Sequence, residues 1–221
     1  ADRRFHAQPD ACFECGPEIG WIESGCAGGL SPEGISWAKN VEESDEIFHR
    51  AAKLIAEGGI VAVKGLGGYH LVCDAANEAA LATLRQRKHR PGKAFAVMVA
   101  SAEEARTLCE VNDAEARQLT SPARPIVLLR KRPDATFAKG LADNPPELGV
   151  MLPTTPVQHL LLHECGGMLV MTSGNIHDEP IVIDEETAFS QLAGVADAFL
   201  VNNREIVGRY DDSVIRILNG G

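Results

Sequence analysis

Long apolar runs are missing from this sequence of 221 residues. None reaches the roughly 18 residues that a membrane-spanning helix needs, and no signal-peptide pattern opens the chain. The apolar share of 45% and the charged share of 24% are ordinary for a globular protein in water. We therefore expect no membrane anchor and a cytoplasmic location.

An excess of positive charge is also missing. Lys and Arg together number 21 against 31 Asp and Glu, which gives a formal net charge of -10. Broad nucleic-acid-binding surfaces usually need a basic excess, so this balance argues against one. It still leaves room for one small basic pocket.

The sequence has few cysteines that lie close together. Of the six, only Cys12 and Cys15 pair locally, in the segment "CFEC". With no secretory signal, we expect a reducing compartment and no disulfide framework. Two thiolates supply half of the ligands that a structural Zn²⁺ needs, and the chain has no second C-x-x-C. Two interpretations stay open: half of a four-cysteine zinc site whose other half lies upstream of residue 1, or free thiols in a turn.

Strands alternate with helices from residue 44 onward. Apolar spacing and capping residues predict helices at 44–57, 77–88, 101 onward, 155–165 and 184–193. Apolar runs predict strands at 60–63, 71–74, 94–99, 125–130, 148–152, 168–172, 198–202 and 213–218. Strands that are apolar throughout indicate an α/β fold with a mostly buried sheet covered by helices. We assign residues 42–221 to this domain and residues 1–41 to an N-terminal appendage, in which residues 1–20 are turn-rich and residues 24–34 resemble an irregular linker.

Four cations gather in the segment "RKHRPGK", where the second predicted helix gives way to a buried strand. Lys88 and Arg90 lie at the rim of the predicted sheet, and open α/β sheets bind ligands at such rims. Arginine offers a planar fork for phosphate oxygens, and lysine offers a compact charge. The alternative is that these cations, with Arg87 and Lys93, only complement the C-terminal end of the helix.

Two polar loops follow other predicted strands. In "TSGN" (172–175), backbone N–H groups, the Ser173 hydroxyl and the Asn175 amide can hold an anion. The alternative is an ordinary polar turn, which has the same residue types. In "KGLGGYH" (64–70), glycines let the backbone approach a ligand, and Lys64 and His70 are candidate ligands for a small acid. A structural lysine at a strand end is the alternative. Neither G-x-G-x-x-G nor the motif of phosphate-binding NTPases occurs.

A charged segment, "NREIVGRYDDSV", precedes the last predicted strand. It brings Arg204 and Arg209 close to Asp211 and Asp212. The carboxylates either bind Mg²⁺ or pair with the arginines, and the sequence leaves both interpretations open.

In order along the chain, several segments carry a family resemblance. They are "GGIVAVKGLGGYHLVCDAANEAALATLRQRKHRPGKAFAVMV", "SPARPIVLL", "LGVMLPTTPVQHLLL", "LVMTSGNIHDEPI" and "RYDDSV". Together they closely resemble the YrdC-like domain of the HypF-type hydrogenase maturation carbamoyltransferases. "RRFHAQPDACFECGP" resembles the end of the second zinc finger directly upstream of that domain. The resemblance covers nearly the whole chain and implies a twisted YrdC-like sheet behind a zinc-finger remnant.

The resemblance implies that the domain binds ATP with Mg²⁺ and activates carbamate as carbamoyl-adenylate. The family's K-x-R pattern falls on Lys88 and Arg90, and its S-x-N pattern falls on Ser173 and Asn175. The implied catalytic residues are Lys88, Arg90 and Lys64. The implied nucleotide contacts are Lys88, Arg90, Lys93, Ser173, Asn175, Arg209 and Ser213. The implied zinc ligands are Cys12 and Cys15.

One loop departs from the threonylcarbamoyl-adenylate synthases, which are relatives of this domain. Their first strand leads into a P-T-D-T-type loop that helps to hold threonine, whereas this chain has "KGLG" (64–67). The change removes a hydroxyl and a carboxylate and adds a cation. It fits a substrate without a side chain, such as bare carbamate.

The family's full route implies further parts. An acylphosphatase-like domain would release carbamate from carbamoyl phosphate, and a Kae1-like domain would pass the carbamoyl group to the partner HypE, on the way to the iron cyanide ligands of [NiFe] hydrogenases. Neither is recognisable in these residues, so we expect a piece of a longer protein. The alternatives are a double-stranded RNA or tRNA-binding module, a threonylcarbamoyl-adenylate synthase, or a spacer that binds no nucleotide.

Overall fold

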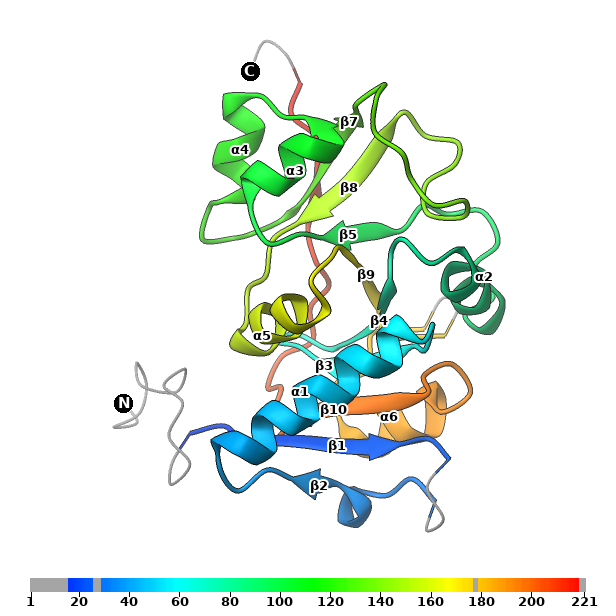
Figure 1. Ribbon diagram of the computed structural model, residues 1–221. Coiled ribbons are helices and arrows are strands. Elements are labelled where there is room, and N and C mark those ends of the chain that lie inside the picture. Colours follow the sequence, from blue (N-terminus) through cyan, green and yellow to red (C-terminus); the bar gives the residue numbers. More distant parts are fainter. Residues whose placement is uncertain (1–15, 26–28, 177–178, 219–221) are drawn as a thin grey trace.

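Strands from both ends of the chain join one mixed sheet (Figure 1). The computed structural model describes residues 16–25, 29–176 and 179–218, and within them the sheet has 11 strands. Their order is β11-β7-β8-β5-β9-β4-β3-β10-β1-β2, with β6 beside β7. The strands are β1 (Ile19–Glu23), β2 (Ser36–Trp37), β3 (Val61–Lys64), β4 (Tyr69–Asp74), β5 (Ala96–Met98), β6 (Cys109–Glu110), β7 (Ile126–Lys131), β8 (Glu147–Met151), β9 (Leu169–Ser173), β10 (Ala198–Asn202) and β11 (Val214–Ile215).

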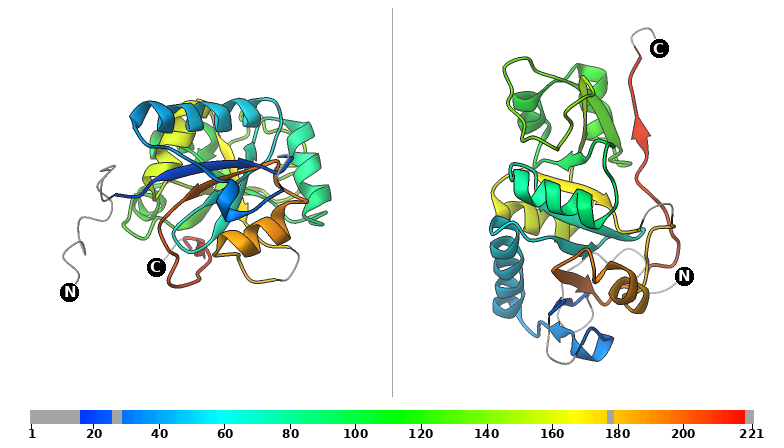
Figure 2. Two further views of the ribbon diagram at one scale, coloured as in Figure 1. Left: turned by 90° about the horizontal axis from the view of Figure 1, so that it is seen from below. Right: turned by 90° about the vertical axis from the view of Figure 1, so that its right-hand side faces the viewer.

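Helices cover both faces of this sheet. They are α1 (Val41–Ala56), α2 (Glu78–Arg87), α3 (Ala102–Leu108), α4 (Asp113–Leu119), α5 (Pro156–Cys165) and α6 (Glu185–Leu192). On one face, α1 and α5 pack through residues such as Phe48 and Leu161. On the other, α2, α4 and α6 pack through Leu84, Leu119 and Phe189. Figure 2 shows α1 and α6 on opposite sides of the strands.

The central strands are buried on both faces. All four residues of β3 are buried, as are five of the six in β4. Val61 and Val63 belong to the α1 side of the core, while Ala62 belongs to the other side. The predicted α/β class with a buried, helix-covered sheet is confirmed. In the described ranges, no helix has the length and apolarity that crossing a membrane requires.

Local capping residues set the ends of the helices. Asn77 caps α2 and Asp184 caps α6, as the sequence predicts. The first helix starts earlier than the predicted residue 44, because the Asn40 side chain accepts a hydrogen bond from Glu43 N (2.8 Å) and caps α1 there.

Two other elements differ from the prediction. The strand predicted at 213–218 is reduced to β11, which pairs with β7 through two residues only. The sequence reading also missed α4, which starts with a capping box formed by Asn112 and Glu115. Its single buried residue, Leu119, gives too weak an apolar pattern to reveal a helix.

The N-terminal part of the chain is more ordered than predicted. β1 pairs along its whole length with β10, antiparallel, and β2 pairs with β1. Trp21 and Ile22 of β1 are each 3% exposed, on opposite sides of the core. Residues 19–23 and 36–37 of the predicted appendage therefore belong to the same sheet as the rest of the described chain. The domain boundary between residues 41 and 42 stays a prediction.

Candidate active site

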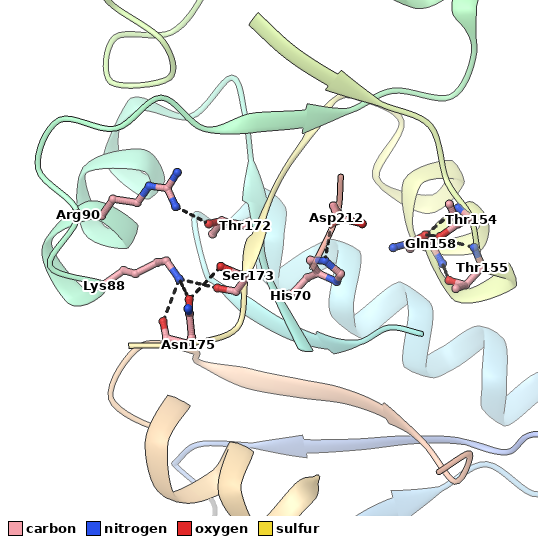
Figure 3. Close-up of polar contacts among 10 residues, drawn as sticks. All are labelled: His70, Lys88, Arg90, Thr154, Thr155, Gln158, Thr172, Ser173, Asn175 and Asp212. Atoms are coloured by element: carbon pink, nitrogen blue, oxygen red, sulfur yellow. Dashed lines mark hydrogen bonds and ion pairs between the residues drawn. The ribbon is translucent and has the colours of Figure 1, made fainter. Parts of the chain in front are cut away.

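Lys88 joins the two polar motifs that the sequence singled out. It follows α2 directly, and only 4% of the residue is exposed. Its Nζ donates hydrogen bonds to the carbonyl oxygens of Ser173 (2.5 Å) and Asn175 (2.9 Å) and to Asn175 Oδ1 (2.6 Å). Figure 3 shows these contacts spanning from the end of α2 to the turn after β9. The K-x-R and S-x-N segments therefore form one cluster, although 85 positions separate Lys88 from Ser173.

The surroundings of Lys88 disfavour the positive charge of its ammonium. The pKa of this lysine is lowered to about 8, mainly because its ammonium is buried and next because Arg90 is nearby. The carboxylate of Asp211 acts in the opposite direction. At pH 7 the group is still mostly protonated, and a bound anion would favour the charged form further.

Arg90 lies beside Lys88 and points toward the same strand (Figure 3). Its Nη1 donates to Thr172 Oγ1 (3.2 Å) and its Nη2 to the Ala94 carbonyl (3.1 Å). Its guanidinium carbon lies 5.4 Å from the centre of the Phe95 ring. Nε is buried and has no hydrogen-bond partner among the described residues. An arginine with a spare donor is suited to bind an anion oxygen.

The turn after β9 is held tightly in its own right. Ser173 Oγ donates to Asn175 Oδ1 (2.9 Å), and Asn175 Nδ2 donates to the Glu179 carbonyl (2.6 Å). Gly174 N donates to the Tyr69 carbonyl (2.6 Å). A Cβ on Gly174 would lie 2.6 Å from that same oxygen, so the close approach to β4 requires glycine.

A cavity of about 330 Å³ lies on the other side of Ser173. His70 connects the two regions, because it lies opposite Ser173 in the β4–β9 pairing and also lines the cavity. The cavity-lining residues are Leu66, Gly67, His70, Pro122, Ala123, Arg124, Pro153, Thr154, Gln158, His159, Tyr210 and Asp212.

Asp212 pairs with His70, at 2.9 Å between Oδ2 and Nε2 (Figure 3). Burial raises the pKa of this carboxyl, but the hydrogen bond and charge of His70 outweigh burial and hold the pKa below its ordinary value. The sequence predicted that Asp212 either binds Mg²⁺ or pairs with a neighbouring arginine. In the structure its partner is His70, which lies 142 positions earlier, in β4.

Sequence reasoning missed five polar residues of the cavity, which are Arg124, Thr154, Gln158, His159 and Tyr210. Gln158 Oε1 accepts hydrogen bonds from Thr154 N (2.8 Å) and Thr154 Oγ1 (2.9 Å). The capping box T-x-x-Q at the start of α5 was the available signal for this group. Arg124 has a left-handed backbone, with φ of 43°, which the sequence does not reveal.

Lys64 lies apart from the cavity-lining residues. It is 4% exposed, and its Nζ donates to Glu185 Oε1 (2.5 Å) and to the Asn202 carbonyl (3.1 Å). The pair links β3 to α6 and β10. The structural-lysine interpretation therefore accounts for every contact that we find for its ammonium, and a catalytic role for Lys64 stays a prediction.

The other predicted nucleotide contacts lie on the surface of the described chain. Lys93, Arg209 and Ser213 are exposed, and the Ser213 carbonyl accepts a hydrogen bond from Ile126 N (2.8 Å). Cys12 and Cys15 lie outside the described residues. Elsewhere in the chain, the described residues contain no group of three or more His, Cys, Asp or Glu side chains arranged to hold a metal ion.

Comparison with known families decides the assignment of the fold. The model of the Sua5/YciO/YrdC family, described as "Telomere recombination", matches residues 53–221. The chain belongs to this family. A second model, the HypF finger, matches residues 1–22 and agrees with the predicted zinc-finger remnant.

Several HypF proteins are similar to this chain over nearly its whole length. It is 49% identical to the carbamoyltransferase HypF of Rhodobacter capsulatus, over 98% of this chain and 27% of that protein. It superposes on full-length HypF in a phosphate- and nucleotide-bound form with a TM-score of 0.83 and 47% identity, over 97% of this chain and 26% of that one. For T. kodakarensis HypF, the TM-score is 0.84 at 41% identity, over 99% of this chain and 27% of that one. The chain thus spans about a quarter of the length of these relatives.

Proposed function

We propose that this chain binds ATP and activates carbamate as carbamoyl-adenylate, with release of pyrophosphate. The observation that carries the proposal is a cluster beside a cavity, in which Lys88 donates to Ser173 and Asn175 and Arg90 donates to the adjacent Thr172. The relative solved in a phosphate- and nucleotide-bound form supports it. The carbamoyltransferase activity named for the HypF relatives is the wider reaction that this step would serve.

In the proposed step, a carbamate oxygen attacks the α-phosphorus of ATP. A new P–O bond forms as the bond from the α-phosphorus to the bridging oxygen breaks, and that electron pair leaves with pyrophosphate. Two anions must approach each other, so the cations of Lys88 and Arg90 would offset their repulsion and the charge that develops on the leaving group. No covalent enzyme intermediate is needed.

The role of Lys88 follows from its contacts. Its three hydrogen bonds fix the turn at Ser173 and Asn175, so it can contribute charge and a shaped turn at once. Arg90 places a second guanidinium charge next to Lys88, where it donates to Thr172 directly before the S-x-N turn, so it would add positive charge on the phosphate side of the cluster.

Metal ions would enter this site with the nucleotide. The described residues offer no cluster of three carboxylate, histidine or cysteine ligands, so the donor set fits a Mg²⁺ held mainly by phosphate oxygens. Mg²⁺ would supply further positive charge to the triphosphate. Asp211, which acts electrostatically on Lys88, is the nearest candidate for an added carboxylate.

The wider assignments belong to the same proposal. Carbamate would come from carbamoyl phosphate through an acylphosphatase-like domain, and HypE would receive the carbamoyl group through a Kae1-like domain. Cys12 and Cys15 would supply two of the four thiolates of a zinc finger, in line with the HypF finger match. A cytoplasmic location also stays a prediction.

Pyrophosphate release tests the proposal directly. We expect slow release when the chain meets Mg-ATP and freshly dissolved carbamate, and none above background with carbamoyl phosphate. The finger and Sua5/YciO/YrdC matches account for residues 1–22 and 53–221, and residues 23–52 between them are too few to form a separate hydrolase domain. An assay specific for pyrophosphate measures both, with the Lys88→Ala variant as the background, because carbamoyl phosphate itself releases phosphate in water.

Threonine should not accelerate this release. The loop at 64–67 has no hydroxyl or carboxylate side chain, and Gly67 is covered by Tyr210, whose N donates to the Gly67 carbonyl (3.2 Å). Release that required threonine plus bicarbonate would instead make the chain a threonylcarbamoyl-adenylate synthase. Salt-sensitive RNA binding without nucleotide binding would favour the RNA-binding alternative.

The affinity for ATP should fall as pH rises above about 8. Lys88 binds an anion only when protonated, and its pKa is lowered to about 8. The affinity for ATP is therefore at its maximum below this pH. Above it, the Kd rises by up to about tenfold per pH unit, because binding then requires the uptake of one proton. Calorimetric titrations with Mg-ATP between pH 7 and pH 9.5 measure the change.

The control for this pH dependence is Lys88→Arg. Arginine stays protonated up to pH about 12, so the affinity of this variant should be flat over the same range, whatever its absolute value. A parallel decrease in both proteins would assign the pH dependence to another group.

A further inference from the structure

The loop that carries the K-x-R cations starts with a strained turn. α2 ends with hydrogen bonds from His89 N to the Gln86 carbonyl (3.2 Å) and from Arg90 N to the Arg85 carbonyl (3.0 Å). This is the helix-ending pattern in which one residue adopts a left-handed backbone, usually glycine. Here that residue is His89, with φ of 51°. Because a non-glycine residue resists this conformation, contacts elsewhere must hold the loop in place.

The Arg85 guanidinium makes those contacts. Its Nη1 donates to the carbonyls of Arg90 (3.0 Å) and Lys93 (2.9 Å), which lie in the loop. Its Nε and Nη2 donate to the Gly140 carbonyl, at 2.8 and 2.5 Å. It also lies 4.3 Å from the centre of the Phe95 ring.

We infer that Arg85 is a positioning residue that fixes the loop carrying Lys88 and Arg90 against the segment at Gly140. It acts through backbone carbonyls, and together with Pro91 and Gly92 it lines a second cavity. A lysine could not take its place, because only the planar guanidinium presents donors to both sets of carbonyls at once. The effect on nucleotide affinity rests on the proposed function, whereas the effect on the loop does not.

Arg87 provides a matched control from the same helix. It is also half-buried and donates through Nη1 to a backbone carbonyl, that of Val195 (2.9 Å), and to Asp197 Oδ1 (2.8 Å). These partners lie away from the loop. Losing Arg87 should therefore cost hydrogen bonds of the same kind without releasing Lys88 or Arg90.

The test compares Arg85→Ala, Arg85→Lys and Arg87→Ala in the full 221-residue chain, by calorimetry with Mg-ATP and by amide hydrogen exchange. For Arg85→Ala we expect the Kd to rise about 10- to 100-fold, which is the effect of losing one charge-assisted hydrogen bond to the nucleotide when the loop moves. Exchange across residues 89–94 should become faster. Arg85→Lys keeps the stem over Phe95 and should show both effects even if the alanine variant folds poorly. Arg87→Ala should show neither.

The outcomes separate this inference from the proposed function. An unchanged Kd for Arg85→Ala and Arg85→Lys, with normal ATP binding by the wild type, would overturn the inference. So would an equal rise in Kd for Arg87→Ala. If the wild type binds no ATP, the proposed function fails, and exchange still decides: faster exchange at 89–94 in the Arg85 variants alone supports the inference, and unchanged exchange refutes it.

Discussion

Replacing Lys88 by alanine is expected to weaken ATP binding about 30-fold or more. Removing one partner of a buried, hydrogen-bonded charge typically costs about 2–5 kcal/mol, and 2 kcal/mol corresponds to about 30-fold in Kd. Two losses combine here, because the variant lacks a cation and also leaves Ser173 and Asn175 without the donor that holds their turn. Calorimetric titration with Mg-ATP measures the Kd, and a melting curve shows whether the fold is intact.

Lys53→Ala is the control for this substitution. Lys53 is an exposed lysine near the end of α1, 4.0 Å from Glu57, so its removal should change neither the Kd nor the melting temperature appreciably. If Lys88→Ala folds normally and binds ATP with unchanged affinity, the cations at the end of α2 only complement that helix end. The sequence left this alternative open.

The elements of the fold that were predictable depend on local sequence. Asn77 and Asp184 cap their helices through backbone N–H groups two or three residues away, so a short window contains the whole interaction. The strand at 198–202 is an apolar run, and its bounds match β10.

The elements that were not predictable depend on distant partners. β1 contains only five residues, and Gly20 interrupts its apolar pattern. It becomes a strand because it pairs with β10, whose residues lie about 180 positions later. Such a pairing supplies hydrogen bonds and burial for Trp21 that no local propensity indicates.

The candidate site shows the same division. Residue type and neighbouring strand made Lys88, Arg90, Ser173 and Asn175 candidates from the sequence, and the family resemblance then selected them. Their mutual hydrogen bonds were not, because a sequence does not state which of several nearby acceptors a side chain reaches. Lys64 illustrates the difference: a cation beside a glycine loop suggested a ligand, whereas its ammonium contacts Glu185, 121 positions away.

Replacing Gly174 by alanine is expected to destabilise the fold and abolish measurable ATP binding. A Cβ at this position would lie 2.6 Å from the Tyr69 carbonyl oxygen and 2.7 Å from Tyr69 Cβ, closer than real Cβ atoms approach. Because the obstacle is largely backbone, the turn must move away from β4, and the hydrogen bond from Gly174 N to Tyr69 is lost. Overpacking of this kind costs about 1–3 kcal/mol. At the upper end, the melting temperature should fall by about 6–12 °C.

The loss of binding follows from what the turn carries. Ser173 and Asn175 flank Gly174, and both accept hydrogen bonds from Lys88, so a displaced turn moves two motif residues and the cation together. Gly167→Ala is the control, because nothing lies within 4 Å of a Cβ there and its φ is not in the left-handed range. It should keep wild-type ATP affinity and melting temperature in the same assays. A Gly174→Ala protein that melts at a lower temperature but binds ATP normally would contradict this prediction. It would show that the turn only stabilises the end of β9 and that the nucleotide binds elsewhere.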